Sequence, residues 1–258
     1  MLELFSADRV RCFGWRRVVL FALMQSMLQP ICSAQAFSDP DWNISFYDNC
    51  GLPSWNSVQW ISEGHDRFIR IKLSHNDIGL CKSDRIRRHR ASHWERAELK
   101  QQGSLDRNQA YELTFSTRFM EGFVGDRETF FQIHAYKGGS CNASPPIMMK
   151  ITGKKILLAA LRKHKGGERR GHDIHLAADS IEKLYGKWIK FKLVFDTSKN
   201  SKVTIYQDGR MIFKNVGFWI QSCGSPHLKF GIYRPGSKLN LHRSVIDFDD
   251  FELEAVDN

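Results

Sequence analysis

Three short segments of the sequence carry side chains that can bind a carboxylate and move a proton. Each segment alternates polar and apolar residues, the pattern of a β-strand whose successive side chains point to opposite faces. The segments span residues 95–100, 130–136 and 228–234. Their polar faces carry Arg96, Glu98 and Lys100; Gln132, His134 and Tyr136; and Lys229, Gly231 and Tyr233. If the three strands are neighbours in one sheet, these side chains form a reactive surface.

These residue types suit β-elimination in a polymer of uronic acids. In that reaction a base removes the proton on C5, next to the carboxylate, and the C4–O bond breaks. Cationic and hydrogen-bonding groups at the carboxylate stabilise the charge that develops there. Arg96 can bind the carboxylate with its fork of N–H groups, and Gln132 can donate an amide hydrogen.

The proton would pass through His134 or Tyr233. His134 can donate a hydrogen bond or act as the base, and Tyr233 can abstract or donate the proton. An isolated tyrosine has a pKa of about 10, so Tyr233 needs cationic neighbours such as Lys229 and Arg234. In glucuronate and mannuronate, H5 and O4 lie on the same side, and Tyr233 can serve as both base and acid. In iduronate and guluronate they lie on opposite sides, which makes His134 the base; the sequence leaves both routes open.

The elements that must position these residues are almost all strands. Further alternating segments predict strands at residues 57–61, 68–74, 111–120, 147–151, 155–161, 187–196, 202–207, 210–214 and 245–255. Asp208-Gly209 predicts a tight hairpin turn, because this dipeptide readily adopts positive φ angles. Only residues 177–185 have a helical pattern. Many short strands at this spacing predict an all-β antiparallel sandwich.

The first 36 residues have the pattern of an export signal. Four arginines precede an apolar run at residues 18–28, and Ala34-Gln35-Ala36 has the form of a cleavage site. We therefore expect a signal peptide at residues 1–36, one domain at residues 37–258, and a secreted or periplasmic protein without a membrane span. Four cysteines remain after the leader, namely Cys50, Cys81, Cys141 and Cys223. They are compatible with two disulfides whose pairing is open.

The chain has 258 residues and a formal net charge of +10. Residues 1–36 carry four arginines and two acidic residues, so the charge without them is +8. In an exported protein such a charge favours an acidic polysaccharide as the partner rather than nucleic acid. Two basic segments, 82–90 and 162–173, are interpreted either as solvated loops or as a rim that attracts a polyanion.

The three strands resemble a known group of enzymes. Arg-x-Glu-Leu at residue 96, Gln-Ile-His at residue 132 and Lys-x-Gly-x-Tyr at residue 229 resemble the signature strands of the β-jelly-roll polysaccharide lyases. The group includes family 7 alginate lyases, glucuronan lyases and heparin lyase I. The resemblance covers about residues 40–256 and is closest to the heparin lyase I-like group, through Ser144-Pro-Pro-Ile, Trp188-Ile-Lys-Phe, the Asp208-Gly209 hairpin and the acidic run 247–252.

The resemblance implies a concanavalin-like β-jelly roll with a concave substrate groove, and it assigns roles to residues. Arg96 and Gln132 would neutralise the carboxylate, His134 would be base or neutraliser, and Tyr233 would donate the proton. The expected substrate contacts are Lys229, Lys100, Tyr136 and Arg234. The alginate lyases usually have Thr or Ser at the position of Ala97, Arg at Lys100, and x-Gln where this chain has Arg234-Pro235. These departures disfavour alginate and favour glucuronan or a heparin-type chain.

Other functional classes fit the sequence less well. A non-catalytic carbohydrate-binding sandwich is the alternative that the fold allows. A glycoside hydrolase needs paired carboxylates, commonly on one strand as Glu-x-Asp-x-x-Glu, and the sequence has no such strand. The histidine pairs His89/His93 and His172/His175 lack the third and fourth ligands of a closed metal site. We expect a monomer that requires no cofactor. The acidic run 247–252 could hold a structural Ca²⁺, but a terminal strand with alternate residues pointing outward is the preferred interpretation.

Overall fold

The structure is a computed structural model that describes residues 36–54, 56–85, 91–121, 123, 127–135, 144–162, 171–198, 201–220, 225–236 and 241–256. These residues belong to one compact unit, Ala34–Asn258. The predicted leader lies outside the described residues except for Ala36, which begins the first strand.

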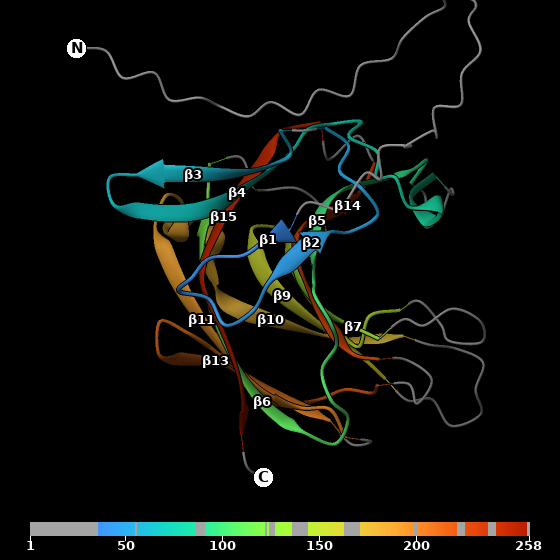
Figure 1. The fold of residues 1–258 in the computed structure, drawn as a ribbon. Coiled ribbons are helices and arrows are strands. Elements are labelled where there is room, and N and C mark those ends of the chain that lie inside the picture. The colour runs from blue at the N-terminus through green and yellow to red at the C-terminus, as the bar shows by residue number, and fades with distance from the viewer. Residues whose placement is uncertain are drawn as a thin grey trace, which may run out of the picture. The chain divides into compact units, whose positions relative to one another are not determined.

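Two antiparallel sheets make up the described fold, as the sequence predicts (Figure 1). The first sheet has the order β1 (Ala36–Phe37), β2 (Phe46–Asp48), β5 (Trp94–Gln101), β14 (His227–Pro235), β7 (Glu128–His134), β8 (Ile147–Thr152), β9 (Lys155–Leu161) and β10 (His172–Ser180). The second has the order β13 (Arg210–Gly217), β12 (Lys202–Gln207), β11 (Trp188–Asp196), β6 (Ala110–Phe119), β15 (Ser244–Val256), β4 (Asp66–Leu73) and β3 (Val58–Glu63).

Alternation along the strands builds the interior between the two sheets. On β6, Leu113, Phe115 and Phe119 are fully buried, whereas Glu112 and Arg118 on the other face are partly exposed. The predicted hairpin joins β12 to β13, and Asp208 and Gly209 both have positive φ angles. Both results confirm the predicted sandwich.

An aromatic cluster fixes the central strands of the first sheet against the second. The Phe230 ring on β14 packs edge-on against Phe115 of β6, with ring centroids 5.0 Å apart. It also contacts Phe251 of β15 at 4.6 Å and Phe131 of β7 at 5.1 Å. Aromatic pairs at these separations add to the stabilisation that comes from buried apolar area. The polar residues that alternate with Phe230 must therefore face away from the interior.

The helical prediction for residues 177–185 is wrong. The first part of that segment belongs to β10, which pairs with β9, and only Ile181–Leu184 forms a 3₁₀ turn, η2. Hydrogen bonds to β9 outweigh the weak helical preference of a short segment. A second 3₁₀ turn, η1, spans Lys82–Arg85. Within the described ranges, no helix is long and apolar enough to cross a membrane.

Candidate functional site

The three strands with unusual polar faces are neighbours, in the order β5, β14 and β7. Tyr233 of β14 lies opposite Arg96 of β5, and Lys229 lies between Lys100 of β5 and Gln132 of β7. Facing residues on adjacent strands lie within side-chain reach of one another. The predicted adjacency is thus confirmed, and these polar residues share one face of the first sheet.

Arg96 is held by two carboxylates. Its Nε and Nη2 donate to Asp84 of η1 at 2.9 and 2.8 Å, and its Nη1 donates to Glu98. Arg96 is only 6% exposed, and Asp84 is fully buried. Burial opposes the positive charge, but Glu98 and Asp84 outweigh it, so that the pKa of Arg96 is raised. A guanidinium has five N–H donors, and these bonds use three of them.

Glu98 connects Arg96 to Gln132. One carboxylate oxygen accepts from Arg96 and from the Asn49 amide, the latter at 3.1 Å. The other oxygen accepts a hydrogen bond from the Gln132 amide nitrogen. Glu98 therefore orients both of the proposed carboxylate-binding side chains and leaves the second N–H of Gln132 for a ligand.

The Tyr233 ring lies against two residues of β5. The Cζ atom of Arg96 lies 4.1 Å from its centroid, and the Trp94 ring is stacked on it at 4.9 Å. A cation over an aromatic face is attracted by the ring quadrupole. These contacts hold the phenol beside the guanidinium that would bind the carboxylate.

Gly231 brings β14 close to β5. Its φ is +137°, and a Cβ atom at this position would lie 2.3 Å from the carbonyl oxygen of Ala97. The pairing of β14 with β7 also shifts register between Phe230 and Tyr233. Close approach of the two backbones therefore explains why this position is a glycine.

Positive charge and burial keep the histidines of the site neutral. Burial, together with Lys229 and His227, lowers the pKa of His134 well below 6.5. The His227 ring stacks on His134 at 5.3 Å, and burial lowers the pKa of His227 to about 4. At neutral pH His134 is an uncharged imidazole, which can accept a proton or donate a hydrogen bond but cannot supply charge.

Lys229 is a buried cation on the same face. It is 7% exposed, and burial lowers its pKa to about 8, with Arg96 and Lys100 adding to the effect and Glu98 opposing it. Lys100 lies between Lys229 of β14 and Tyr47 of β2, with its Nζ 5.6 Å from the centroid of the Tyr47 ring. The two lysines thus place positive charge on this face of the sheet.

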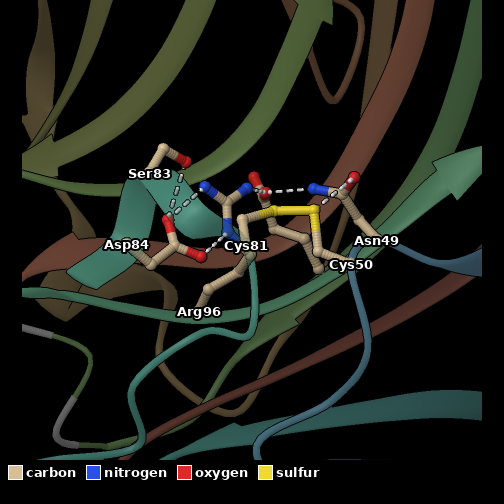
Figure 2. The surroundings of a disulfide bond; sticks show 7 residues. Asn49, Cys50, Cys81, Ser83, Asp84 and Arg96 are labelled. Carbon is tan, nitrogen blue, oxygen red and sulfur yellow. Dashed lines mark hydrogen bonds and ion pairs between the residues drawn. A yellow bond between two sulfur atoms is a disulfide. The ribbon is translucent and has the colours of Figure 1, made fainter. Parts of the chain in front are cut away.

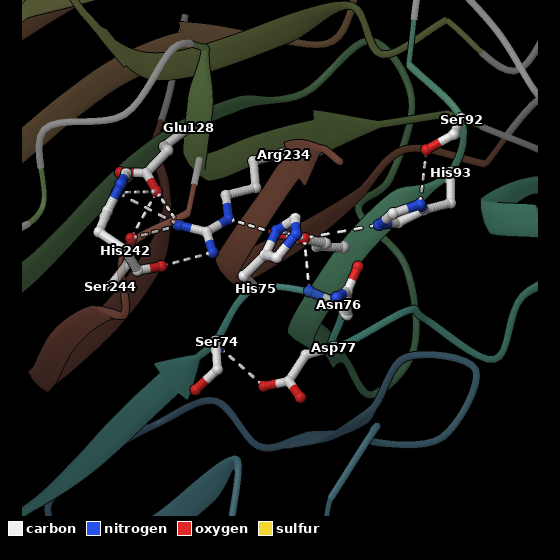
Figure 3. Close-up of polar contacts among 11 residues, drawn as sticks. Ser74, His75, Asn76, Asp77, Ser92, His93, Glu128, Arg234, His242 and Ser244 are labelled. Carbon is white, nitrogen blue, oxygen red and sulfur yellow. Dashed lines mark hydrogen bonds and ion pairs between the residues drawn. The ribbon is translucent and has the colours of Figure 1, made fainter. Parts of the chain in front are cut away.

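Arg234 is not on the polar face, and its interpretation as a substrate contact is corrected. Its side chain is fully buried and donates to Glu95 at 2.6 Å and to Glu128 at 2.6 Å (Figure 3). It also donates to Ser244 at 2.8 Å and to the carbonyl oxygen of His242 at 2.9 Å. Alternation explains the result, because a residue adjacent to Tyr233 must point to the opposite face.

Other predicted residues lie outside this cluster. Tyr136 falls outside the described residues, as do Cys141, Cys223 and most of the two basic segments. Asp247 of the acidic run is buried and bonds to Arg70 at 2.7 Å and Arg118 at 2.8 Å. In the described part of the chain, no group of three or more His, Cys, Asp or Glu side chains is arranged to hold a metal ion.

Sequence reasoning missed several residues of the site, among them Asn49, which binds Glu98. Trp94 and His227 continue the alternation of β5 and β14 by one step, so an extension of each pattern by two residues would have found them. Asp84 comes from a turn twelve residues before Arg96 in the sequence, and no local pattern indicates that contact.

A cavity elsewhere in the fold includes none of these residues. It has a volume of about 540 Å³ and lies between the edge strands β10 and β13. Its lining includes His175, Leu176, Phe213 and Lys214. This cavity is thus separate from the candidate site, which lies on the polar face of β5, β14 and β7.

A two-sheet sandwich with Arg, Gln, His and Tyr on neighbouring strands defines the class of a β-jelly-roll lyase. Residues 53–247 match the family model described as "Polysaccharide lyase". The chain therefore belongs to this polysaccharide lyase family. Comparison with curated protein sequences gives no match.

Several solved structures share the fold. An endo-β-1,4-glucuronan lyase from the fungus Trichoderma reesei superposes with a TM-score of 0.61 at 13% identity, over 83% of this chain and 91% of that one. The alginate lyase PA1167 from Pseudomonas aeruginosa gives 0.54 at 14% identity, over 79% and 87%. The exolytic family 7 alginate lyase AlyA5 from Zobellia galactanivorans gives 0.50 at 14% identity, over 85% and 88%. At such identities the likeness concerns the fold.

Proposed function

We propose that the protein cleaves an acidic polysaccharide that contains uronic acid, by β-elimination, and leaves 4,5-unsaturated ends. The observation that supports the proposal is that Arg96, Gln132, His134 and Tyr233 come from three adjacent strands and alternate with residues of the core, so that they share one face of the sheet. Convergent polar groups of defined geometry are the mark of a reactive site.

In this proposal Arg96 and Gln132 bind the uronate carboxylate. Each keeps N–H donors beyond those given to Asp84 and Glu98. Their donors stabilise the negative charge that develops when C5 loses its proton. Lys229, opposite Gln132, would be a third side chain that donates to the carboxylate.

His134 and Tyr233 handle the proton. The lowered pKa of His134 favours the role of base, or of neutral hydrogen-bond donor, over that of cationic neutraliser. Tyr233, held against Arg96, would protonate the leaving O4 oxygen and, on the route in which H5 and O4 lie on the same side, would also take the C5 proton.

Glucuronan or a heparin-type chain is the proposed substrate class. The heparin lyase I-like sequence features support this choice. Ala97, Lys100 and Arg234-Pro235 depart from the alginate lyase pattern. We further propose that the protein is exported, acts as a monomer and needs no cofactor.

The experiment is a panel of glucuronan, heparin, heparan sulfate and alginate, followed by ultraviolet absorbance of the unsaturated uronate product. We expect product from glucuronan or from the heparin-type chains. Binding to a polymer without any unsaturated product would contradict the proposed reaction and favour a carbohydrate-binding sandwich.

The variant Tyr233→Phe tests the proton step. Loss of a general acid or base typically lowers a rate by about 10²–10⁴-fold, and we expect kcat to fall within this range. Tyr206→Phe, on β12 of the second sheet, is the matched control and should keep normal turnover. Near-normal turnover of Tyr233→Phe would exclude both proton routes.

His134→Ala should impair cleavage of iduronate-containing chains more than that of glucuronate-containing chains, because His134 would be the base only where H5 and O4 lie on opposite sides.

A further inference from the structure

A disulfide has Asn49, Asp84 and Arg96 in its surroundings (Figure 2). It joins Cys50, just after β2, to Cys81, just before η1, across 31 positions of sequence. Figure 2 shows the Arg96 guanidinium bonded to the Asp84 carboxylate, and the Asn49 side chain beside Cys50 of the disulfide. The bond thus connects two loops that both reach the candidate site.

Each loop supports one of the carboxylates that hold Arg96. On one side, Asp84 follows Cys81 by three residues and binds Nε and Nη2 of Arg96. On the other side, Asn49 directly precedes Cys50 and donates its side-chain amide to Glu98 at 3.1 Å. The Asn49 backbone N–H also donates to the Glu98 carbonyl at 2.9 Å.

The space for Asp84 depends on close packing of its loop against β5. A Cβ atom at Gly79 would lie 2.2 Å from an Asp84 carboxylate oxygen and 2.8 Å from the Cβ atom of Arg96. The Arg96 backbone N–H donates to the Asp77 carbonyl at 3.1 Å, which brings the same loop alongside the strand. A displacement of this loop therefore moves the carboxylate away from the guanidinium.

We propose that the Cys50–Cys81 disulfide and Asp84 form a positioning device that fixes the Arg96 guanidinium for the uronate carboxylate, so that reduction of the disulfide lowers turnover. Asp84 acts through Arg96 and is a positioning residue. This inference rests on the proposed function. Its physical basis is that small displacements of a binding group reduce the transition-state stabilisation that the group provides.

Reduction consumes two electrons and two protons and leaves two thiols, with dithiothreitol as the reductant in the test. A reductant acts on every disulfide in the chain, so the double variant Cys50→Ser/Cys81→Ser isolates this one. We expect this variant and Asp84→Asn each to lower kcat by about 10-fold to 100-fold. KM should change less, because the lost alignment matters most when charge develops at the carboxylate.

A matched control comes from the second sheet. Asp247 is also fully buried and binds Arg70 through Nε at 2.7 Å and Nη2 at 2.9 Å, in the same two-bond geometry. Asp247→Asn should lower the melting temperature but leave kcat unchanged below it. Assays of all variants are run below the lowest melting temperature of the series.

A second measurement is independent of turnover. Nitrogen-15 NMR of arginine side chains detects the Arg96 Nε–H, which is identified by its loss in Arg96→Lys. In the intact protein this proton should exchange slowly with water because it is buried against Asp84, and exchange should accelerate at least 10-fold in the double serine variant.

The two measurements separate the possible failures. Unchanged Nε–H exchange in the double serine variant overturns the positioning role, whatever the enzyme cleaves. Equal loss of kcat in Asp84→Asn and Asp247→Asn also overturns it, since general destabilisation then explains both. Wild-type protein that gives no product from any polymer, while exchange accelerates as expected, contradicts the proposed function alone.

Discussion

The charge on Lys229 decides at which pH the proposed site binds its substrate. Burial lowers the pKa of this lysine to about 8, from 10.5 in the unfolded chain. The ammonium is therefore charged below pH 8 and loses its proton above it. Next to Gln132, the charged form attracts a carboxylate and the neutral form does not.

We expect kcat/KM on an acidic polymer to fall as the pH rises through about 8, which is the pKa of Lys229. Lys229→Arg should move this basic limb to higher pH, because arginine keeps its charge. The measurement is a pH–rate profile of kcat/KM, which reports groups of the unliganded enzyme. Lys100→Arg is the control, and a basic limb that stays in place in Lys229→Arg would refute the assignment.

The same shift makes Lys229 a cost to stability. Between pH 8 and 10.5 the unfolded chain binds more protons at this position than the folded protein does. Stability contributed by this group therefore rises with pH over that window. Retention of a buried cation that opposes folding is expected where the charge serves the reaction rather than the fold.

At the scale of elements, the site depends on how closely β14 approaches β5. Gly231→Ala would place a Cβ atom 2.3 Å from the Ala97 carbonyl oxygen, at a φ of +137° that an alanine rarely adopts. We expect this variant to lower the melting temperature by several degrees and to reduce kcat, because Tyr233 and Arg96 move apart.

Gly217→Ala at the end of β13 is the control, since a Cβ atom there meets nothing within 4 Å and we expect little change. Thermal unfolding and turnover are measured together on both variants. A Gly231→Ala protein as stable and active as the wild type would show that the two strands tolerate a wider separation.

The ends of three strands in the first sheet meet at Arg234. The guanidinium lies between Glu95 of β5 and Glu128 of β7, and Ser244 of the second sheet closes the network. Burial opposes the charge on Glu128, but His242, Ser244 and Arg234 outweigh it and lower its pKa. The ionised Glu128 therefore stabilises the fold at pH values above the pKa of an ordinary glutamate. This stabilisation is lost as the pH falls through the lowered pKa of Glu128.

Arg234→Met would leave two buried carboxylates without their cation. Removal of one partner of a buried ion pair costs about 3–5 kcal/mol, and we expect urea unfolding to report a loss of this size. KM for the polymer should stay close to that of the wild type in the fraction that folds. A stable Arg234→Met protein with a raised KM would restore Arg234 as a substrate contact.

Alternation of residues predicted most of these elements because one face of each strand is buried. It predicted β6, β11 and the three site strands, including which side chains share a face. Alternation also places Arg234 on the face opposite Tyr233, although we assigned it to the substrate because it is next to Tyr233 in the sequence. The pattern failed for β10, where pairing with β9 determines the structure, and for Asp84, whose contact with Arg96 depends on tertiary packing.

For the whole molecule, net charge governs how a polyanion arrives. The full sequence has 38 Lys and Arg residues and 28 Asp and Glu residues, a formal charge of +10, and without the predicted leader the charge is +8. Several acidic residues form ion pairs with basic residues, such as Asp247 with Arg70 and Glu112 with Lys192, and such pairs leave the net charge unchanged. An excess of positive charge attracts an acidic chain over distances comparable to the Debye length, about 10 Å at 0.1 M salt.

We therefore expect kcat/KM on a long uronate polymer to fall steeply as salt rises from about 0.01 to 0.5 M, as the attraction is screened. A short uronate oligosaccharide places fewer charges in this field, so its kcat/KM should fall less. Buried contacts at Arg96 and Gln132 are screened much less, so kcat should change little for either substrate. Equal salt dependence for the polymer and the oligosaccharide would place the electrostatic contribution within the site, at Lys229 and Arg96, rather than in the overall charge.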